Sequence, residues 1–457
     1  MHPGETSNRV DLAHALDHGE WSPFQRWVLV LAALSFTVDG LANQVLGLAV
    51  PAIVNDWRVT RGDFASVQAA GLIGVAIGTW IGGMIGDRYG RRVGLIGSVL
   101  LLGVTDALCA GASNTHELLV LRALAGFGIG GAIPNGAALI AEFTPLKRRS
   151  MALAVGMVFI PVGGFVSSVL ATYLLPAFGW RSLFLAGGLI PIAVAVILIL
   201  ALPESPRFLL HKPQRRVELV KLLGRFGYGF SSDAEFVDGA RPTDRSPVAA
   251  LFGRDTRRET LVLWIGFFFC LMANYTLLSW LPTMFSMLGS TGSQAADQVI
   301  NPNVAQTSFH LGGIIGGVSC GWMIHTLGSR IAGTFISLGG MLGAAVLAAL
   351  LYGTPASSLA VFVILVAEGF FIAGIHTALY TLATYAYPPF IRATGVGAAS
   401  AVGRTGAIAS SFTGVWTLNV GGASVFFVSI AGMIGVVLIA TLLMRRHIER
   451  AAAVPSN

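Results

Sequence analysis

The feature that most constrains this chain is a series of long, uninterrupted apolar runs, each of about 20 residues or more. As a helix, such a run spans the hydrocarbon core of a bilayer, which is about 30 Å thick. Only 11% of the residues are charged and 54% are hydrophobic, whereas soluble domains carry about 25% charged residues. The sequence therefore predicts an all-α integral membrane protein.

Twelve apolar runs can be read along the chain, and each predicts one transmembrane helix. A polar stretch separates the sixth run from the seventh. We expect an N-terminal half of six helices (1–202), a cytoplasmic central loop (203–259) and a C-terminal half of six helices (260–457). The predicted helices cover residues 27–53, 64–86, 93–112, 117–141, 150–175, 181–202, 260–285, 304–324, 331–352, 358–386, 395–420 and 423–444.

The two halves repeat a sequence pattern, which predicts a pseudo-symmetric fold. The segment GGMIGDRYGRR, which begins at Gly82, aligns with CGWMIHTLGSR, which begins at Cys320. Duplicated halves are typical of transporters whose binding site lies between the halves, near the membrane midplane. Further matched pairs are Gly74 with Gly312, Gly78 with Gly316, and Gly126 with Gly369.

Lysine and arginine gather in the loops that would share the cytoplasmic side with the N-terminus. The opposite side would hold only Arg58, Arg61 and Arg181. Because cytoplasmic loops carry an excess of basic residues, both termini are predicted to lie in the cytoplasm and the protein in the inner (plasma) membrane. The same topology accounts for the isoelectric point of about 9.7, so the basic charge gives no reason to expect a nucleic-acid partner.

The short loop between the second and third runs carries the sequence GDRYGRR, which begins at Gly86. Its glycines permit a tight turn, while Asp87 can cap a helix or pair across the interface between the halves. The simplest alternative is a loop that is merely positive. Because the pattern recurs in the second half, we interpret it as a conformational latch in which Glu142 pairs with Arg88 or Arg92. The predicted gating residues are Gly83, Asp87, Arg88, Gly90, Arg91, Arg92 and Glu142.

The pattern G-x-x-x-D-R-x-G-R-R, from Gly83 to Arg92, resembles the signature of the major facilitator superfamily. Finer features resemble the aromatic acid:proton symporter family, among them Asp39-Gly40, SWLPTMF (279–285) and YPPFIRATGVG (387–397). The resemblance implies a twelve-helix fold, alternating access and symport of an aromatic acid with protons. One departure stands out: the motif D-G-x-D of the first helix reads DGLA here, so Ala42 replaces the second acid.

Asp39 lies near the middle of the first apolar run, one helical turn before Asn43 and on the same face. A carboxylate at that depth costs roughly 2.5–3.5 kcal/mol on insertion scales. One interpretation is a structural carboxylate bonded to a neighbouring helix. The functional interpretation is an acid that binds a proton or contacts the substrate.

Arg404 lies in the middle of the eleventh run, where its repeat partner in the first half is Pro161. An arginine without a counterpart is poorly explained as scaffold, and its planar guanidinium suits a carboxylate. We expect it to bind the substrate anion. The alternative is an ion pair with an acid such as Asp39 or Glu368.

Other polar groups within the runs are candidates for proton coupling. Arg122, in the fourth run, is predicted to act in gating or coupling, with an ion pair to Asp106 as the structural alternative. Glu368 and His376, eight residues apart in the tenth run, can relay protons. A hydrogen-bonded structural role is the alternative for His376, as it is for His310 in the eighth run.

In the seventh run, Asn274 and Tyr275 offer hydrogen-bond donors and an aromatic face, although aromatic residues in membrane helices are more often packing. The predicted substrate-binding residues are Arg404, Asp39, Asn43, Tyr275, Asn274, His310, Glu368 and His376. The residues predicted to couple proton movement are Asp39, Glu368 and Arg122.

Two glycine patterns bear on nucleotide binding, and neither supports it. The segment GFGIGG (126–131) has the spacing of a dinucleotide fingerprint but lies inside an apolar run, so close helix packing explains it better. None of the three lysines follows a glycine, so the chain has no P-loop and no ATP drive of its own. The sequence also lacks a catalytic or metal-binding constellation, which predicts a protein that is not an enzyme and needs no cofactor.

Together these observations predict a secondary transporter that imports a small aromatic or related organic carboxylate with protons by alternating access. Its partners would be the organic anion, protons and the lipid bilayer, and we expect a monomer. Transport of another solute, such as a sugar, nicotinate or an organic cation, and efflux by the same fold remain alternatives. A membrane sensor is the alternative from a different class, and the short tails argue against it.

Overall fold

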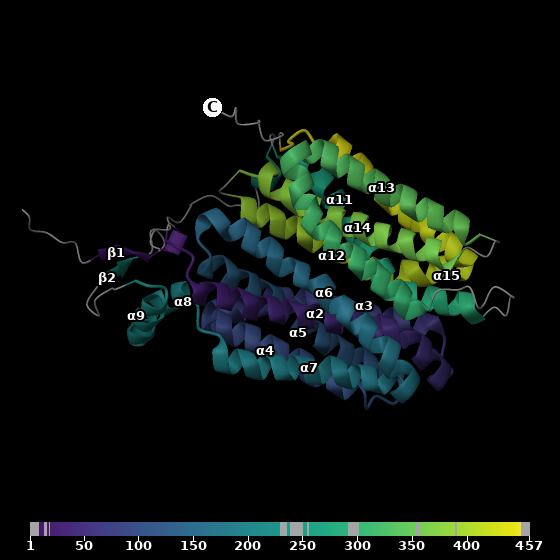
Figure 1. Cartoon of the computed structure of the whole chain (residues 1–457), viewed down its shortest axis with the longest axis horizontal. Coiled ribbons are helices and arrows are strands. Elements are labelled where there is room, and N and C mark those ends of the chain that lie inside the picture. Colours follow the sequence, from purple (N-terminus) through teal and green to yellow (C-terminus); the bar gives the residue numbers. More distant parts are fainter. Residues whose placement is uncertain are drawn as a thin grey trace, which may run out of the picture.

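The computed structural model describes residues 9–12, 16–17, 19–228, 235–237, 250–253, 256–290, 301–352, 357–388 and 391–448. Its long helices run along the long axis of the molecule (Figure 1). They are α2 (Pro23–Trp57), α3 (Arg61–Tyr89), α4 (Arg91–Cys109), α5 (Thr115–Phe143), α6 (Leu146–Phe178), α7 (Trp180–Ala201), α11 (Arg257–Ser290), α12 (Pro302–Leu327), α13 (Ser329–Leu350), α14 (Ser358–Ala386) and α15 (Arg392–Leu443).

Helix α15 is two helices joined at a kink, because Gly421 and Gly422 have non-helical backbone angles. Among the described residues, ten helices, α15 included, are long and apolar enough to cross a membrane. Counting the two legs of α15 separately gives eleven long helices, and the 26-residue α12 brings the number of long helices in the described chain to twelve. The predicted twelve-helix fold is therefore confirmed.

The helices pack in two groups. Helices α2 to α7 lie together in the lower part of Figure 1, and α11 to α15 lie together in the upper part. The groups meet where α2 packs on α11, α3 on α15 and α6 on α12. The predicted domain boundaries at residues 202 and 260 stay a prediction.

Matched glycines make equivalent contacts in the two groups. Gly74 of α3 lies against the backbone carbonyl of Ala123 in α5, and Gly312 of α12 lies against that of Val366 in α14. Gly78 with Phe127 and Gly316 with Phe370 repeat the pattern. A side chain at these glycines would collide with the partner helix, so the absence of Cβ allows the backbones to touch. Close packing, predicted for GFGIGG, is confirmed because Gly126 lies on the carbonyl of Gly71.

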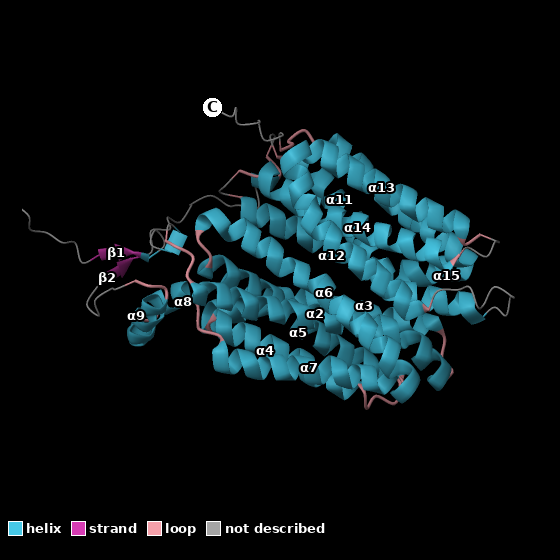
Figure 2. Ribbon diagram, in the orientation of Figure 1, coloured by secondary structure: helices cyan, strands magenta, loops and turns pink. Residues whose placement is uncertain are grey.

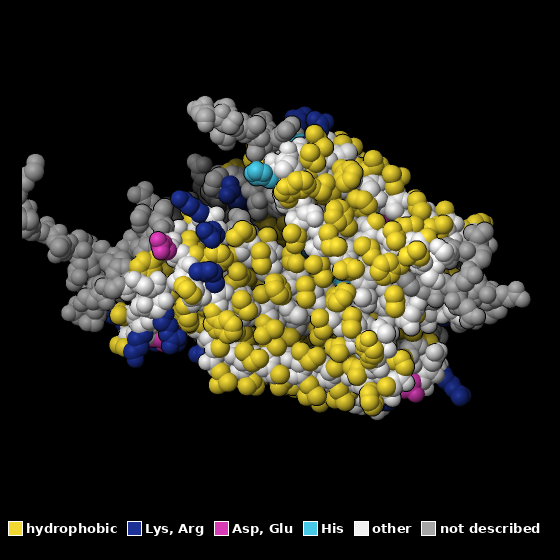
Figure 3. Space-filling model, in the orientation of Figure 1, with side chains coloured by type: hydrophobic (Ala, Val, Ile, Leu, Met, Phe, Trp, Pro, Cys, Tyr) yellow, Lys and Arg dark blue, Asp and Glu magenta, His cyan; other side chains and the backbone are white. Residues whose placement is uncertain are grey.

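Apolar side chains cover the long face of the molecule, while Lys and Arg gather at one end (Figure 3). The lipid-facing surface includes Leu200 of α7, 81% exposed, Phe335 of α13, 54% exposed, and Val428 of α15, 59% exposed. These are the sixth, ninth and twelfth spans, whose apolar cores lack charged residues. An exposed apolar belt of this kind suits a bilayer and not water.

The short elements lie at the basic end of the molecule (Figure 2). They are α8 (Pro206–Leu210), a 3₁₀ turn (Pro213–Arg215), α9 (Arg216–Arg225) and a parallel two-stranded sheet of β1 (Arg9–Asp11) and β2 (Glu235–Val237). Leu222 and Leu223 of α9 belong to a buried cluster with Leu12, Leu16 and Phe143. Leu12, Leu16 and α9 therefore pack against the N-terminal group of helices.

Candidate functional site

The structure brings an acidic and a basic side chain together across the boundary between the halves. Asp39, in the middle of α2, is 3% exposed and interacts electrostatically with the half-buried Arg404 of α15. One of the Asp39 carboxylate oxygens has no hydrogen-bond partner in the described structure. The Arg404 guanidinium therefore lies near a carboxylate that has one oxygen available to accept a further hydrogen bond.

Three more predicted residues join this pair. Tyr275 of α11 interacts electrostatically with both Asp39 and Arg404, and the side chain of Asn43 approaches its hydroxyl. His376 of α14 interacts with Arg404. The five residues come from α2, α11, α14 and α15 and form what we call the central cluster: Asp39, Asn43, Tyr275, His376 and Arg404.

The sequence analysis missed Tyr380 and Ser400, which extend the cluster. The Tyr380 hydroxyl and the Ser400 hydroxyl are 2.8 Å apart. The ring centroid of Tyr380 lies 5.0 Å from that of His376 and 4.9 Å from that of Phe267, both edge to face. Helical spacing could have found both residues, because Tyr380 lies one turn after His376 and Ser400 one turn before Arg404.

The remaining predicted ligands lie elsewhere or at the margin. Glu368 is fully buried, and its carboxylate lies against Gly343 of the peripheral helix α13, so it points away from the central cluster. His310 of α12 packs on Gly164 of α6, where the halves meet, with Gln306 at 3.3 Å from its Nε2. Asn274 is half-buried beside Tyr275 on α11. Their predicted roles in binding or coupling stay predictions.

A second ion pair is buried within the N-terminal half. Arg122 of α5 donates from Nη1 to Oδ1 of Asp106 in α4, at 2.6 Å. Its Nη2 lies 3.4 Å from the backbone carbonyl oxygen of Ala42 in α2. The pair that the sequence offered as the structural alternative therefore forms, and it touches the helix that carries Asp39.

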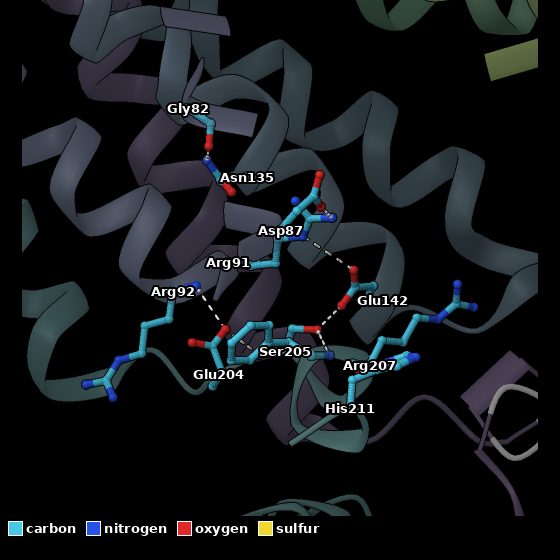
Figure 4. Close-up of polar contacts among 11 residues, drawn as sticks. Gly82, Asp87, Arg91, Arg92, Asn135, Glu142, Glu204, Ser205, Arg207 and His211 are labelled. Atoms are coloured by element: carbon cyan, nitrogen blue, oxygen red, sulfur yellow. Dashed lines mark hydrogen bonds and ion pairs between the residues drawn. The ribbon is translucent and has the colours of Figure 1, made fainter. Parts of the chain in front are cut away.

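The basic loop and its surroundings form a network at the end of the molecule that is predicted to face the cytoplasm (Figure 4). Gly90, with φ of +113°, connects α3 to α4 in a conformation that favours glycine. The backbone NH of Arg92 donates to Oε1 of Glu204 at 3.0 Å. Asn135 of α5 donates to the Gly82 carbonyl at 2.9 Å and so ties α5 to α3.

Two predicted partners in this network are different in the structure. Glu142 lies 3.9 Å from Arg91 and accepts from the Ser205 hydroxyl, where Arg88 or Arg92 was expected. Arg88 instead extends over the ring of Tyr89 on the surface. Asp87 pairs with Arg91 one turn on, within its own half. The turn at Gly90 causes the change, because it aims Arg91 back at both carboxylates.

Contacts between the halves also include two glutamines that the sequence analysis missed. Gln44 of α2 donates to the Leu278 carbonyl at 2.8 Å, and Gln68 of α3 donates to the Ser279 hydroxyl at 2.6 Å. Both lie in the parts of α2 and α3 that are nearer the connection between these two helices. By the predicted orientation, these hydrogen bonds join the halves on the outer side of the membrane.

The residues of the central cluster suit the binding of a small organic ion. Among the described residues, no group of three or more His, Cys, Asp or Glu side chains could hold a metal ion. The central cluster instead offers one guanidinium, one carboxylate, an imidazole and the phenolic hydroxyl of Tyr275, to which Tyr380 adds a second. Such a set can bind a small organic ion and orient an aromatic ring.

Comparison with known proteins gives a consistent result. The profile of the Major Facilitator Superfamily matches residues 32–411. The chain is 33% identical over 418 residues to a gallate transporter of Pseudomonas putida, with 90% of each chain covered. It is 32% identical to the 4-hydroxybenzoate transporter PcaK of Pseudomonas aeruginosa, again over 90% of each chain, and 28% identical to the niacin transporter NiaP of Acinetobacter baylyi, over 88% and 89%.

Solved structures with the same fold include the xylose transporter XylE of E. coli, described as a partially occluded inward-open conformation. The TM-score is 0.70, and 93% of this chain and 99% of that chain are covered. At 17% sequence identity the likeness concerns the fold alone.

Proposed function

Since this chain belongs to the major facilitator superfamily and is a transporter related to aromatic acid transporters, we propose that it imports a small aromatic carboxylate together with a proton. It is a multi-pass membrane protein and not an enzyme. The relatives' names specify gallate, 4-hydroxybenzoate and niacin, all of which are aromatic carboxylates. The proposal gives this chain the same substrate class.

The observation that carries the proposal is the opposition of Arg404 and Asp39 across the two halves. A guanidinium presents a planar fork of donors that fits a carboxylate in a bidentate manner. A substrate carboxylate would take the place of Asp39 at Arg404. Binding would then change the contact between the halves, which is what alternating access requires.

Charge balance explains why a proton should accompany the substrate. Without a substrate, the central cluster has no net charge, because the negative charge of Asp39 balances the positive charge of Arg404. A substrate anion would leave one uncompensated negative charge in a site that excludes much of the solvent, which is strongly unfavourable. One proton restores neutrality, so the anion and the proton favour each other's binding.

The aromatic residues around Arg404 support a ring-bearing substrate. Tyr275 and Tyr380 flank the charged pair, and His376 stacks edge to face on Tyr380. Aromatic rings attract one another in offset or edge-to-face arrangements at centroid distances of about 4.5–7 Å. The phenolic hydroxyls and Ser400 add hydrogen-bonding groups that suit a hydroxylated ring.

The contacts between the halves fit an inward-facing state. Gln44 and Gln68 join the halves on the predicted outer side, while Asp87 and Glu142 of the latch make their contacts within the N-terminal half. We infer that the latch engages the C-terminal half when the inner side closes. Substrate would enter from outside in that second state and leave in the state described here.

The test is uptake by the purified protein in proteoliposomes, across a panel of aromatic acids with an imposed inward proton gradient. Benzoate, 4-hydroxybenzoate, gallate and nicotinate are compared with benzamide, xylose and a quaternary ammonium ion. Accumulation of at least one aromatic carboxylate that depends on the gradient is expected. Transport of the neutral or cationic compounds alone would contradict the substrate class, and uptake that ignores the gradient would contradict symport.

A further inference from the structure

We propose that the transported proton binds to Asp106, and that Arg122 passes the effect of this binding to the segment of α2 that carries Asp39 and Asn43. The inference rests on the proposed symport and names the residue that performs it. Asp106 lies in α4, outside the central cluster.

Asp106 and Arg122 form a buried ion pair within the N-terminal half. Asp106 is 0% exposed and Arg122 is 3% exposed. The pair is joined at Oδ1, while Oδ2 of Asp106 and Nε of Arg122 have no hydrogen-bond partner in the described structure. A buried charge without its partner is strongly destabilised, so a change in one member must be answered by movement of the other.

Arg122 is the charged group that responds to a proton on Asp106. Gly187 of α7 lies next to Oδ2 of Asp106, and Val45 of α2 packs on the same glycine; neither residue titrates. Within α4, the Cys109 thiol one turn away is the other titratable group that interacts with it. Neutralising Asp106 therefore has one main consequence, which is to release the guanidinium of Arg122.

A released guanidinium has other acceptors within reach. A cavity of about 10 Å³ lies beside Arg122, and it is lined by Asn43 and Gln68 among apolar residues. That is close to the space one water molecule needs. Nη2 of Arg122 already lies 3.4 Å from the carbonyl oxygen of Ala42. The acceptors open to a freed Arg122 are that carbonyl and the amide oxygens of Asn43 and Gln68.

This movement reaches the central cluster through α2. Asp39 lies three residues before Ala42 and four before Asn43, so all three share one stretch of helix surface. Asn43 also approaches Tyr275 across the halves. When the Arg122 side chain moves away from Asp106 and toward α2, its positive charge comes closer to Asp39. The attraction between Asp39 and Arg404 then becomes weaker.

The net charge of the buried groups, any bound substrate included, is the same with and without substrate and proton. The net charge is zero when no substrate is bound, because the two carboxylates of Asp39 and Asp106 balance the two guanidinium groups of Arg122 and Arg404. With a proton on Asp106, Arg122 compensates Asp39 and leaves Arg404 available to a substrate carboxylate, so the loaded protein is again neutral. The proton enters from the outer solution and leaves to the cytoplasm, and no covalent bond other than that to the proton forms or breaks.

The same geometry accounts for the departure at Ala42. The motif D-G-x-D leads one to expect an acid there, and the backbone of Ala42 is the part of α2 that Arg122 touches. Asp106 supplies from α4 the carboxylate that position 42 lacks.

The test compares Asp106→Asn with wild type in proteoliposomes by two assays that use one carboxylate accepted by the wild type. Substrate exchange at equal pH on both sides requires no net proton movement, whereas accumulation under an inward proton gradient does. We expect Asp106→Asn to retain exchange within about threefold and to lose accumulation at least tenfold. Its affinity for the carboxylate should also vary less with pH between 5 and 8 than that of the wild type. Asp106→Glu and the neighbouring control Cys109→Ala should keep accumulation.

Accumulation by Asp106→Asn at more than half the wild-type level would overturn the inference. Equal loss of exchange and accumulation in folded protein would also overturn it, because that pattern marks a structural residue. If Asp106→Asn does not fold, Asp106→Ser, which also removes the carboxylate and keeps Arg122, is judged by the same two assays. A wild-type protein that ignores the gradient would refute the proposed symport itself, a result distinct from either outcome in Asp106→Asn.

Discussion

Replacing Arg404 should separate substrates by charge. Arg404→Gln keeps a polar side chain but removes the positive charge that opposes Asp39 in the central cluster. A carboxylate would lose two charge-assisted hydrogen bonds, which are worth about 1.5–3 kcal/mol each. It would also face Asp39 without compensation.

The expected magnitude follows from these terms. Because the glutamine amide still donates one hydrogen bond, we take the net loss as about 3 kcal/mol, the value of two such bonds at the low end of their range. Each 1.4 kcal/mol is tenfold in affinity, so the dissociation constant of a carboxylate should rise about 100-fold. A neutral analogue with the same ring interacts with Arg404 only weakly and should change by less than about threefold.

The assay is equilibrium binding to purified protein, with benzoate or its best-bound relative measured against the matching amide. Thr405→Ala, on an exposed neighbour in α15, serves as the control and should leave both affinities unchanged. An equal loss of affinity for the acid and the amide would refute the reasoning and make Arg404 a structural residue.

Three further predictions address other parts of the molecule. Asp39→Asn removes the group that competes with the substrate for Arg404, so carboxylates should bind up to about tenfold more tightly at pH 7.5 while gradient-driven accumulation falls; weaker binding in titration calorimetry would contradict this. Glu368→Gln should keep gradient-driven uptake within twofold, because its carboxylate faces Gly343 and not the cluster; loss of uptake would return Glu368 to the coupling pathway. Gly78→Ala places a methyl group on the backbone of Phe127, and this overpacking, worth about 1–3 kcal/mol, should lower the melting temperature by a few degrees. The control Gly97→Ala, whose methyl group meets open space, should leave the melting temperature unchanged. Equal melting curves for the two variants would show that α3 and α5 can separate at no cost.

The sequence was sufficient to predict the helices because a bilayer imposes one requirement on every span. Each must be about 20 residues long and apolar, whatever its neighbours are. The duplicated glycines were equally legible, since only close backbone approach explains Gly74 and Gly312 at matched positions. Arg404 and Asp39 could be placed in the interior because a charge facing lipid is too costly.

Sequence could not determine the rotation of a helix about its axis or the partner that each side chain meets. Glu368 and His376 are about 80° apart around α14, and that angle separates a contact with α13 from a contact with Arg404. The choice of Arg91 as the partner of Glu142 depends on the turn at Gly90. Tyr380 and Ser400 were missed because neither carries a charge that would mark it as unusual in an apolar run.

The central claim is that one proton neutralises one substrate anion, and the effect of membrane potential on uptake tests it most directly. Proteoliposomes with an inward proton gradient are clamped at zero or at an inside-negative potential with valinomycin and potassium, and the initial rate of carboxylate uptake is measured. The account predicts electroneutral transport, in which the rate follows the pH gradient and is the same at both potentials. A rate that rises severalfold at the inside-negative potential would mean that positive charge crosses with each substrate, and it would contradict the account.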